Sequence, residues 1–242
     1  MRDVLILIPS FNEERNIGEV LQSLQSAELD VDILVINDGS SDDTERVARK
    51  GRAMVISHPA NLGYGAALQT GFKFASSRGY RYVVQCDADG QHRMEDVASI
   101  VREIRKDTAD VLIGSRFFLD KELNLGPAKM LAIRIFTRLI RRLTGDRITD
   151  PTSGLRGLSR RVFVYYAETD RFPSDYPDAD MLIHMSLSGY EIREIGVGSH
   201  PRIQGKSMHQ GIRPVVYMAK ICLSILAVWV SHFLRGRRDQ HA

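Results

Sequence analysis

Short apolar runs and amphipathic segments alternate along the first half of the chain. Five apolar runs that end at polar or glycine-containing turns are predicted to be strands: Val4–Ile8, Ile33–Ile36, Met54–Ile56, Tyr82–Cys86 and Val111–Ile113. Helical spacing or helix-capping residues predict helices between them, over 17–24, 41–48, 63–77 and 94–105. Continuous apolar strands that alternate with helices are typical of a mostly parallel sheet with helices on both faces, so we predict an α/β fold.

The second half of the chain contains two longer helical patterns. Residues 128–143 form an amphipathic pattern with four arginines on one face: Arg134, Arg138, Arg141 and Arg142. That face fits either an ordinary solvated surface or a membrane-surface role. The segment from Val215 to Leu234 is mostly apolar and, at about 30 Å of helix, long enough to span a bilayer. Lys220 and His232 interrupt it, which favours a helix that lies in the membrane interface or pairs with another helix, with a core helix as the alternative.

Charge is distributed unevenly. Residues 202–242 carry seven Lys or Arg and one Asp, whereas residues 1–201 carry 26 basic and 29 acidic residues. We therefore expect a catalytic domain over 1–210 and a basic, membrane-associated helix and tail over 211–242. Anionic lipid or phosphate is the expected partner of this end, because no nucleic-acid-binding motif accompanies the charge. Cys86 and Cys222 lie in apolar runs without metal-ligand spacing, and no secretory signal is expected, which together indicate a reducing compartment.

The main candidate for chemistry is the pair Asp87 and Asp89, at the carboxyl end of the fourth predicted strand. Open α/β sheets bind ligands at this edge. In an extended backbone alternate side chains point the same way, so both carboxylates can face one ion. Mg²⁺ or Mn²⁺ prefers such oxygens and shares its shell with substrate phosphates, and Gln91 offers another oxygen. A metal on a diphosphate stabilises the charge that develops as the diphosphate leaves.

Polar residues also follow the first two predicted strands. Pro9, Phe11 and Glu13 follow or close the first strand, and Asp38 follows the second, where a carboxylate can accept hydrogen bonds from a ribose or base. On local sequence alone, the favoured interpretation of Asp38 is a capping aspartate at a turn. Neither a dinucleotide-binding glycine pattern nor a P-loop pattern follows these strands. The three strand ends together predict a nucleotide crevice.

Taken together, these motifs resemble the family 2 glycosyltransferases of the GT-A fold over nearly the whole chain. The matching segments are 9–13, 37–42, 61–63 and 87–92. Later segments look like the dolichol-phosphate mannose synthase group: 114–117, 150–156 and 202–207. This resemblance implies a divalent metal, Mg²⁺ or Mn²⁺, on Asp87, Asp89 and Gln91. It implies a nucleotide site at Pro9, Phe11, Glu13, Asp38 and Asp87. It also implies a polyprenyl phosphate acceptor, with Arg116, Arg202 and Ser207 at phosphates.

Elementary chemistry agrees with these roles. Arg116 follows the fifth predicted strand, where a guanidinium can grip a phosphate with two parallel hydrogen bonds. Arg202, Lys206 and Ser207 form a basic loop with a glycine hinge, for which a plain surface loop is the alternative. Arg134 is a further candidate for the acceptor phosphate. Asp150 precedes a proline and is predicted to orient the acceptor or an arginine.

Asp178 and Asp180 open a predicted helix over 181–188, where the related group usually carries an amide and a Glu. This departure leaves the acceptor open. A phosphate acceptor is already an anionic nucleophile and needs no general base, whereas a sugar hydroxyl needs a carboxylate such as Asp150 or Asp180 to take its proton. The catalytic candidates are therefore Asp89, Arg116, Asp150 and Asp180.

The predicted function is metal-dependent, inverting transfer of a hexose from a UDP- or GDP-sugar to a polyprenyl phosphate. The alternatives are transfer to a hydroxyl of a surface polysaccharide or lipid-linked glycan, and a non-catalytic nucleotide-sugar-binding or scaffold protein. Many relatives carry two or more transmembrane helices after the catalytic domain, but this sequence has only the segment 215–234. We therefore expect peripheral attachment at the cytoplasmic face of the membrane, anchorage by that segment, or a membrane-protein partner.

Overall fold

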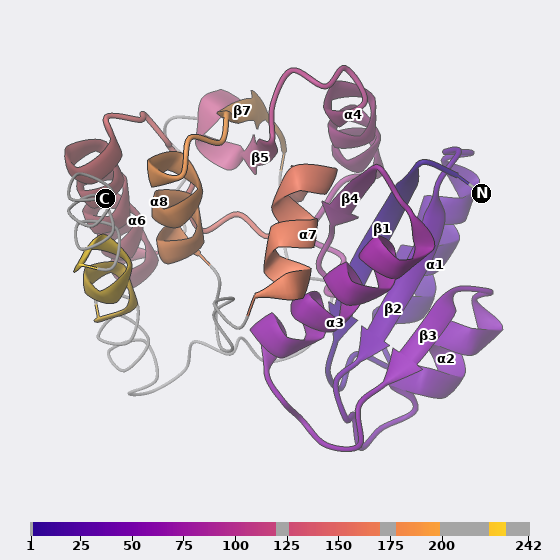
Figure 1. Cartoon of the computed structure of the whole chain (residues 1–242). Coiled ribbons are helices and arrows are strands. Elements are labelled where there is room, and N and C mark those ends of the chain that lie inside the picture. The colour runs from indigo at the N-terminus through magenta and orange to yellow at the C-terminus, as the bar shows by residue number, and fades with distance from the viewer. Residues whose placement is uncertain (1, 120–125, 170–177, 199–222, 231–242) are drawn as a thin grey trace.

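A seven-stranded mixed sheet forms the centre of the molecule in the computed structural model, which describes residues 2–119, 126–169, 178–198 and 223–230 (Figure 1). The strand order is β3-β2-β1-β4-β6-β5-β7. β6 runs antiparallel to both of its neighbours, and the other pairs are parallel. The strands are β1 (Val4–Ser10), β2 (Asp32–Asn37), β3 (Met54–Ser57), β4 (Tyr82–Gln85), β5 (Val111–Ser115), β6 (Arg156–Ser159) and β7 (Ile192–Gly196).

Helices cover both faces of this sheet. They are α1 (Ile17–Ser26), α2 (Thr44–Lys50), α3 (Tyr64–Arg78), α4 (Met94–Ile104), α5 (Arg116–Leu119), α6 (Pro127–Thr144), α7 (Arg160–Glu168) and α8 (Ala179–Leu187). The alternation of side chains along β1 separates two cores. Leu5 and Leu7 pack with apolar residues of α3, α6, α7 and α8, whereas Val4, Ile6 and Ile8 pack with those of α1, α2 and α4. All seven residues of β1 are buried, which explains its continuous apolar run.

The structure confirms the predicted α/β class and the five predicted strands, with small shifts at their ends. The fourth strand ends at Gln85, one residue earlier than expected. Four elements were not predicted: α5, β6, α7 and β7. β6 has the sequence Arg-Gly-Leu-Ser, which lacks an apolar run, and all four residues are buried because it lies between β4 and β5.

The second half of the chain places α6, α8 and a helix over 223–230 on one side of the molecule (Figure 1). Ile225 of the last helix is buried in the same core cluster as Phe136 and Ile140 of α6. The remainder of the long helix expected near 212–234, and the expected domain boundary at 210, lie outside the described residues. Within the described ranges, no helix has the length and hydropathy required to cross a membrane.

Candidate active site

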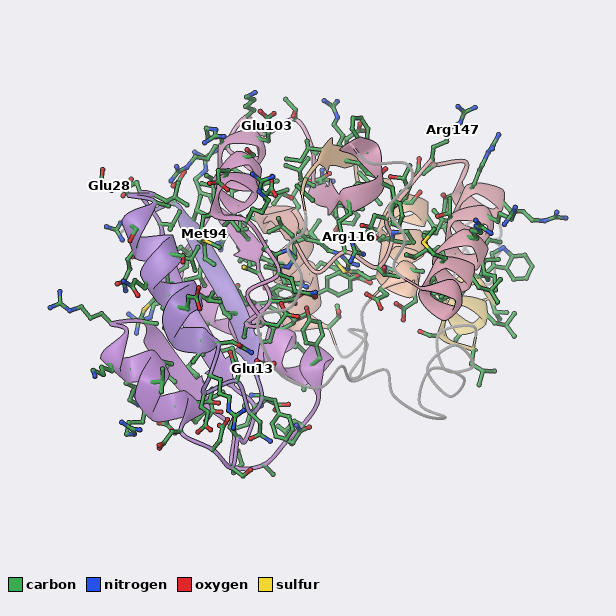
Figure 2. The ribbon with its side chains drawn as sticks, turned by 180° about the vertical axis from the view of Figure 1, so that it is seen from behind. Glu13, Glu28, Met94, Glu103, Arg116 and Arg147 are labelled. Carbon is green, nitrogen blue, oxygen red and sulfur yellow. The ribbon has the colours of Figure 1, made fainter. Side chains whose placement is uncertain are left out.

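The carboxyl ends of β1 and β2 are joined by hydrogen bonds between the loops that follow them. The backbone N–H of Asn12 donates to Ser40 Oγ at 2.9 Å, and the N–H of Ser41 donates to Asn12 Oδ1 at 2.9 Å. Asn12 adopts a left-handed conformation, with φ of 54°, which Asn tolerates better than most residues. In Figure 2, Glu13 lies at the opposite end of the sheet from Glu28 and Glu103. The predicted convergence of these strand ends is therefore present.

Asp38 lies at this convergence and is 3% exposed. Its Oδ1 is 2.7 Å from His58 Nδ1 and accepts a hydrogen bond from the N–H of Leu62, and its Oδ2 accepts one from the N–H of Gly63. The carboxylate thus ties the end of β2 to the segment that enters α3. The predicted contact of Asp38 with a nucleoside stays a prediction, and its anchoring role was not predicted from the sequence.

The other nucleotide candidates differ in accessibility. Pro9 is buried within β1, and Phe11 directly after that strand is 44% exposed. Glu13 is partly buried, and its Oε2 accepts a hydrogen bond from Asn16 Nδ2 at 2.6 Å. Phe11 is therefore the most accessible of these three candidates. Its exposed ring beside a strand end offers an apolar surface for a base.

Asp87 follows β4 and is held by two side chains. Tyr64 Oη donates to its Oδ1 at 2.9 Å, and His92 Nε2 lies 3.2 Å from its Oδ2. Burial opposes ionisation of Asp87, but the hydrogen bond and charge of His92, the Tyr64 hydroxyl and the charge of Arg116 outweigh burial and lower the pKa of Asp87. The side chain keeps a third of its surface exposed, so an anionic carboxylate faces solvent here.

The chain turns directly after Asp87, which corrects the expectation of an extended Asp-x-Asp segment. Ala88 and Asp89 form a turn that Gly90 closes with φ of 74°, and the N–H of Gln91 donates to Asp89 Oδ1 at 3.1 Å. Asp89 therefore lies in a turn, and Gln91 follows that turn. Among the described residues, no three His, Cys, Asp or Glu side chains are grouped as a metal site.

Two carboxylates and an amide nevertheless fit Mg²⁺ or Mn²⁺. Such ions are commonly bound by one or two protein carboxylates, with substrate phosphates and water completing the shell. The lowered pKa of Asp87 keeps its carboxylate in the form that binds a cation. Asp87, Asp89 and Gln91 are thus suited to a site that the substrate completes.

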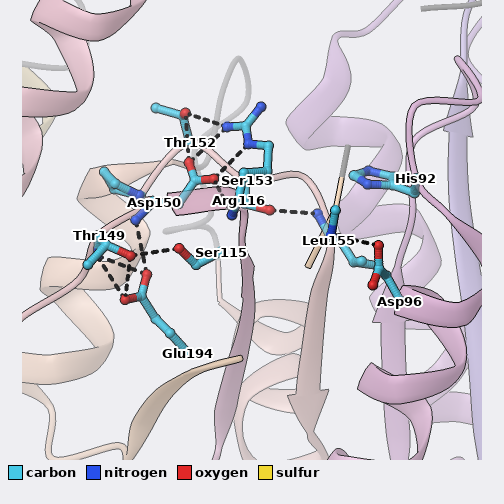
Figure 3. Close-up of polar contacts among 12 residues, drawn as sticks. His92, Asp96, Ser115, Arg116, Thr149, Asp150, Thr152, Ser153, Leu155 and Glu194 are labelled. Carbon is cyan, nitrogen blue, oxygen red and sulfur yellow. Dashed lines mark hydrogen bonds and ion pairs between the residues drawn. The ribbon is translucent and has the colours of Figure 1, made fainter. Parts of the chain in front are cut away.

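Arg116, at the start of α5, forms a two-point ion pair with Asp150 (Figure 3). Its Nε donates to Asp150 Oδ2 at 2.7 Å and its Nη2 to Asp150 Oδ1 at 2.8 Å. Asp150 is fully buried, and Arg116 keeps 14% of its side chain exposed. Burial opposes the charged guanidinium, but the carboxylate of Asp150 prevails and raises the pKa of Arg116. Among the described residues, the hydrogen bonds from the guanidinium use Nε and Nη2, and none uses Nη1.

Glu194 of β7 holds the backbone that carries Asp150 (Figure 3). Its carboxylate accepts hydrogen bonds from the N–H groups of Thr149 and Asp150, at 2.9 and 3.0 Å, and from Thr149 Oγ1. Thr149 Oγ1 also lies 2.6 Å from Ser115 Oγ, next to Arg116. Burial raises the pKa of Glu194, against the hydrogen bonds it accepts. Glu194 was not predicted from the sequence, because 44 residues separate it from Asp150.

Arg156 of β6 is a buried cation that organises the 150–156 segment. It is 1% exposed, donates to the carbonyl oxygens of Pro151 and Ser153 at 2.9 Å, and lies 3.5 Å from Asp178 Oδ1. A buried guanidinium is tolerated only when such acceptors surround it. The sequence analysis did not single out Arg156 as a buried residue. Only the structure shows that this charged residue begins a central strand, which pairs with both β4 and β5.

The remaining predicted residues lie apart from this cluster or outside the described residues. Asp180, in the first turn of α8, is 1% exposed and accepts a 2.5 Å hydrogen bond from Ser224 Oγ of the last helix. Arg134 lies on the exposed face of α6. Arg202, Lys206 and Ser207 lie outside the described residues. The structure thus brings Arg116 together with Asp150 and close enough to Asp87 to affect its charge, while Asp180 sits beneath the 223–230 helix.

The cluster of polar side chains lies at the carboxyl edge of a mostly parallel α/β sheet, which is the edge where proteins of this fold class bind ligands. The family model described as glycosyl transferase family 2 matches residues 5–166, and the chain belongs to this family. It is a glycosyltransferase of the kind represented by the dolichol-phosphate mannose synthase group.

Two similar proteins illustrate this relationship. The chain is 30% identical over 215 residues to the UDP-N-acetylglucosamine–dolichyl-phosphate N-acetylglucosaminyltransferase of Methanococcus voltae, covering 80% of this chain and 84% of that protein. It is 32% identical over 165 residues to the polyprenol monophosphomannose synthase of Mycolicibacterium smegmatis, covering 65% and 62% of the two chains.

A solved structure supports the fold. Glucosyl-3-phosphoglycerate synthase from Mycobacterium tuberculosis, in complex with Mn²⁺ and UDP-glucose, superposes with a TM-score of 0.71. The identity is 19%, and the match covers 94% of this chain and 79% of that one. At this identity the likeness concerns the fold, which the two chains share although their sequences have diverged.

Proposed function

We propose that this glycosyltransferase transfers a hexose from a UDP- or GDP-sugar to a polyprenyl phosphate, with Mg²⁺ or Mn²⁺ held by Asp87, Asp89 and Gln91. The observation that carries this proposal is the arrangement at the carboxyl edge of the sheet, where Tyr64 and His92 hold the partly exposed carboxylate of Asp87 and Asp150 holds the guanidinium of Arg116 close enough to act on the charge of Asp87. A bound divalent ion would neutralise the negative charge of the departing nucleoside diphosphate. Arg116 would contribute the Nη1 edge of its guanidinium to a phosphate oxygen.

The residues around Arg116 hold it ready for this task. Asp150 takes the Nε and Nη2 edge of the guanidinium, and Glu194 fixes the backbone of Asp150. The side chain therefore loses little conformational freedom when it meets a phosphate, because its rotamer is already set. Asp150 acts in this proposal as the orienting group for Arg116.

The placement of the two candidate general bases favours a phosphate acceptor. Both oxygens of Asp150 accept hydrogen bonds from Arg116, and Asp180 is buried beneath Ser224. Neither is placed to accept a proton from a sugar hydroxyl, whereas a phosphate acceptor needs no base. A phosphate acceptor also agrees with the Methanococcus voltae relative, an N-acetylglucosaminyltransferase named for dolichyl phosphate. If Asp180→Asn abolished transfer while the fold was kept, the hydroxyl acceptor would be favoured instead.

A membrane-facing surface suits a lipid acceptor. The exposed face of the 223–230 helix carries Leu223, Leu226 and Val230, and α6 exposes Leu131 and Ile135. Arg134, Arg138, Arg141 and Arg142 lie on the exposed side of α6 as well. Apolar side chains next to arginines fit the interface of an anionic membrane. We propose peripheral attachment through this surface at the cytoplasmic face, where nucleotide sugars are available.

The direct test is a panel of radiolabelled UDP- and GDP-sugars, incubated with the enzyme, Mn²⁺ or Mg²⁺ and purified polyprenyl phosphate. One donor should label the lipid, EDTA should abolish labelling, and Asp89→Ala should reduce it to the level without enzyme. Asp30→Ala is a matched control, because Asp30 belongs to another Asp-x-Asp pair and 77% of its side chain is exposed. Full transfer in EDTA, or by the Asp89 variant, would rule out the proposed mechanism.

A further inference from the structure

Tyr64 connects the first turn of α3 to the predicted metal ligand Asp87. Its hydroxyl lies 2.9 Å from Asp87 Oδ1 and 2.8 Å from Nε2 of Gln85, which is itself 2% exposed at the end of β4. The three residues form a short chain of hydrogen bonds that begins in the sheet and ends at the carboxylate. Neither the family motifs nor the spacing of acidic residues pointed to Tyr64 or Gln85.

The direction of this chain follows from the chemistry of its members. The Gln85 amide nitrogen can only donate, so the Tyr64 oxygen accepts that hydrogen bond. The single hydroxyl proton is then left for Asp87 Oδ1. A tyrosine hydroxyl ordinarily titrates at about pH 10, so at neutral pH its proton is present and points to Asp87 Oδ1. Tyr64 is therefore a fixed donor to one oxygen of Asp87.

The backbone before Tyr64 fixes the position of its ring. The N–H groups of Leu62 and Gly63 are held by the carboxylate of Asp38, and Gly63 has φ of 101°, which disfavours residues with a side chain. On the other side of Asp87, a Cβ built on Gly154 would lie 2.0 Å from Oδ2. Asp87 is thus enclosed between the hydroxyl of Tyr64, His92 and the backbone of Gly154, with little room for another rotamer.

We propose that Tyr64 is a positioning residue that orients the carboxylate of Asp87 toward a divalent cation. This inference rests on the proposed function, because it takes Asp87 as a metal ligand. Each carboxylate oxygen has two lone pairs, and the Tyr64 proton occupies one on Oδ1, which leaves the other for the cation. Groups that orient a ligand in this way commonly contribute about 10- to 100-fold to metal affinity.

The test replaces the hydroxyl and keeps the ring. Tyr64→Phe should weaken Mn²⁺ binding about tenfold, measured by EPR of free Mn²⁺ with UDP or GDP present, and should lower kcat/KM for transfer in parallel. Tyr80→Phe is the matched control, because Tyr80 is also buried and donates a hydrogen bond to an aspartate, Asp32, in another part of the sheet. The control should bind Mn²⁺ as the wild type does, and thermal melts should show that both variants are folded.

Asp87→Ala separates failure of this inference from failure of the proposed function. If Asp87→Ala loses Mn²⁺ but Tyr64→Phe binds it as tightly as Tyr80→Phe does, the positioning role of Tyr64 is wrong and the metal site stands. If Asp87→Ala binds Mn²⁺ as the wild type does, the metal site itself is wrong. A loss of affinity confined to Tyr64→Phe and Asp87→Ala supports both.

Discussion

Gly154 leaves room for Asp87, because the carboxylate occupies the space that a side chain would fill. A Cβ at this position would lie 2.0 Å from Oδ2 and 2.7 Å from Cγ of Asp87, well inside van der Waals contact. Gly154→Ala should therefore push the carboxylate out of place and reduce kcat/KM by about 10- to 100-fold, the effect expected when a ligand loses its orientation. Steady-state transfer assays and Mn²⁺ titration would measure this loss.

Gly18→Ala in α1 is the control for this substitution. There the added Cβ meets only Val47 Cγ1, at 3.2 Å, and a helical alanine is favourable. Its activity should match the wild type. Equal activity of the two variants would mean that Asp87 has another acceptable rotamer.

At the residue scale, the sequence located the acidic strand end but not the groups that hold it. Asp87, Asp89 and Arg116 follow apolar strands, so local pattern was sufficient to single them out. Tyr64 and Glu194 reach the site from 23 and 44 residues away along the chain, measured to Asp87 and Asp150. Such contacts depend on how α3 and β7 pack, which leaves no signal in a single sequence.

At the scale of elements, Asp180 links α8 to the 223–230 helix and should make their packing sensitive to pH. Burial raises the pKa of Asp180 above the unfolded value of about 3.9. An acid with a raised folded pKa contributes most to the free energy of unfolding below about pH 4, and this contribution is lost as pH rises through the folded pKa. Asp180→Asn cannot ionise, so its stability relative to the wild type should improve as pH rises above 4.

Urea unfolding at several pH values between 4 and 8 would measure this trend. Asp43→Asn is a useful comparison, because the hydrogen bond from Arg46 lowers the pKa of Asp43, so its stabilising contribution is already present above about pH 4 and the relative stability of that variant should stay nearly constant from pH 4 to 8. A stability difference between Asp180→Asn and the wild type that is independent of pH would contradict ionisation of Asp180 in the folded protein.

The strands show which elements a hydrophobic pattern can predict and which it cannot. β1 to β5 were recognised because each contains a continuous apolar run, which is typical of parallel strands, and all except the edge strand β3 are mostly or fully buried. β6 could not be recognised, since Arg156 is its first residue and Gly157 its second. Its strand conformation comes from antiparallel pairing with β4 and β5, and its buried arginine is accommodated by the carbonyl groups of the preceding loop.

At the scale of the whole molecule, charge and apolar surface gather on the side formed by α6 and the 223–230 helix. Figure 2 shows Arg147, just after α6, projecting outward at this edge, whereas Arg116 lies toward the middle of the molecule. Arg116 and the peripheral arginines therefore belong to different parts of the molecule. If this side faces a membrane, its apolar and basic residues should contribute to binding in separable ways.

Leu226→Glu tests the apolar part of this surface. Leu226 is 55% exposed, and burying a Leu side chain in the interface would contribute about 1.5–3 kcal/mol. At about 1.4 kcal/mol per factor of ten, the variant should bind phosphatidylglycerol vesicles about 10- to 100-fold more weakly in co-sedimentation. Met54→Glu, on the edge strand β3, is the control and should bind as the wild type does.

Arg134→Gln combined with Arg138→Gln tests the basic part. Each arginine near an anionic surface is worth about 1 kcal/mol, so binding to phosphatidylglycerol should fall while the weak binding to phosphatidylcholine stays the same. Added salt should weaken wild-type binding and reduce the difference between the two proteins, because it screens surface charge within about 10 Å at 0.1 M. Equal binding of all variants to both lipids would place the membrane contact elsewhere on the chain, and the lipid acceptor would then have to reach Arg116 from another side.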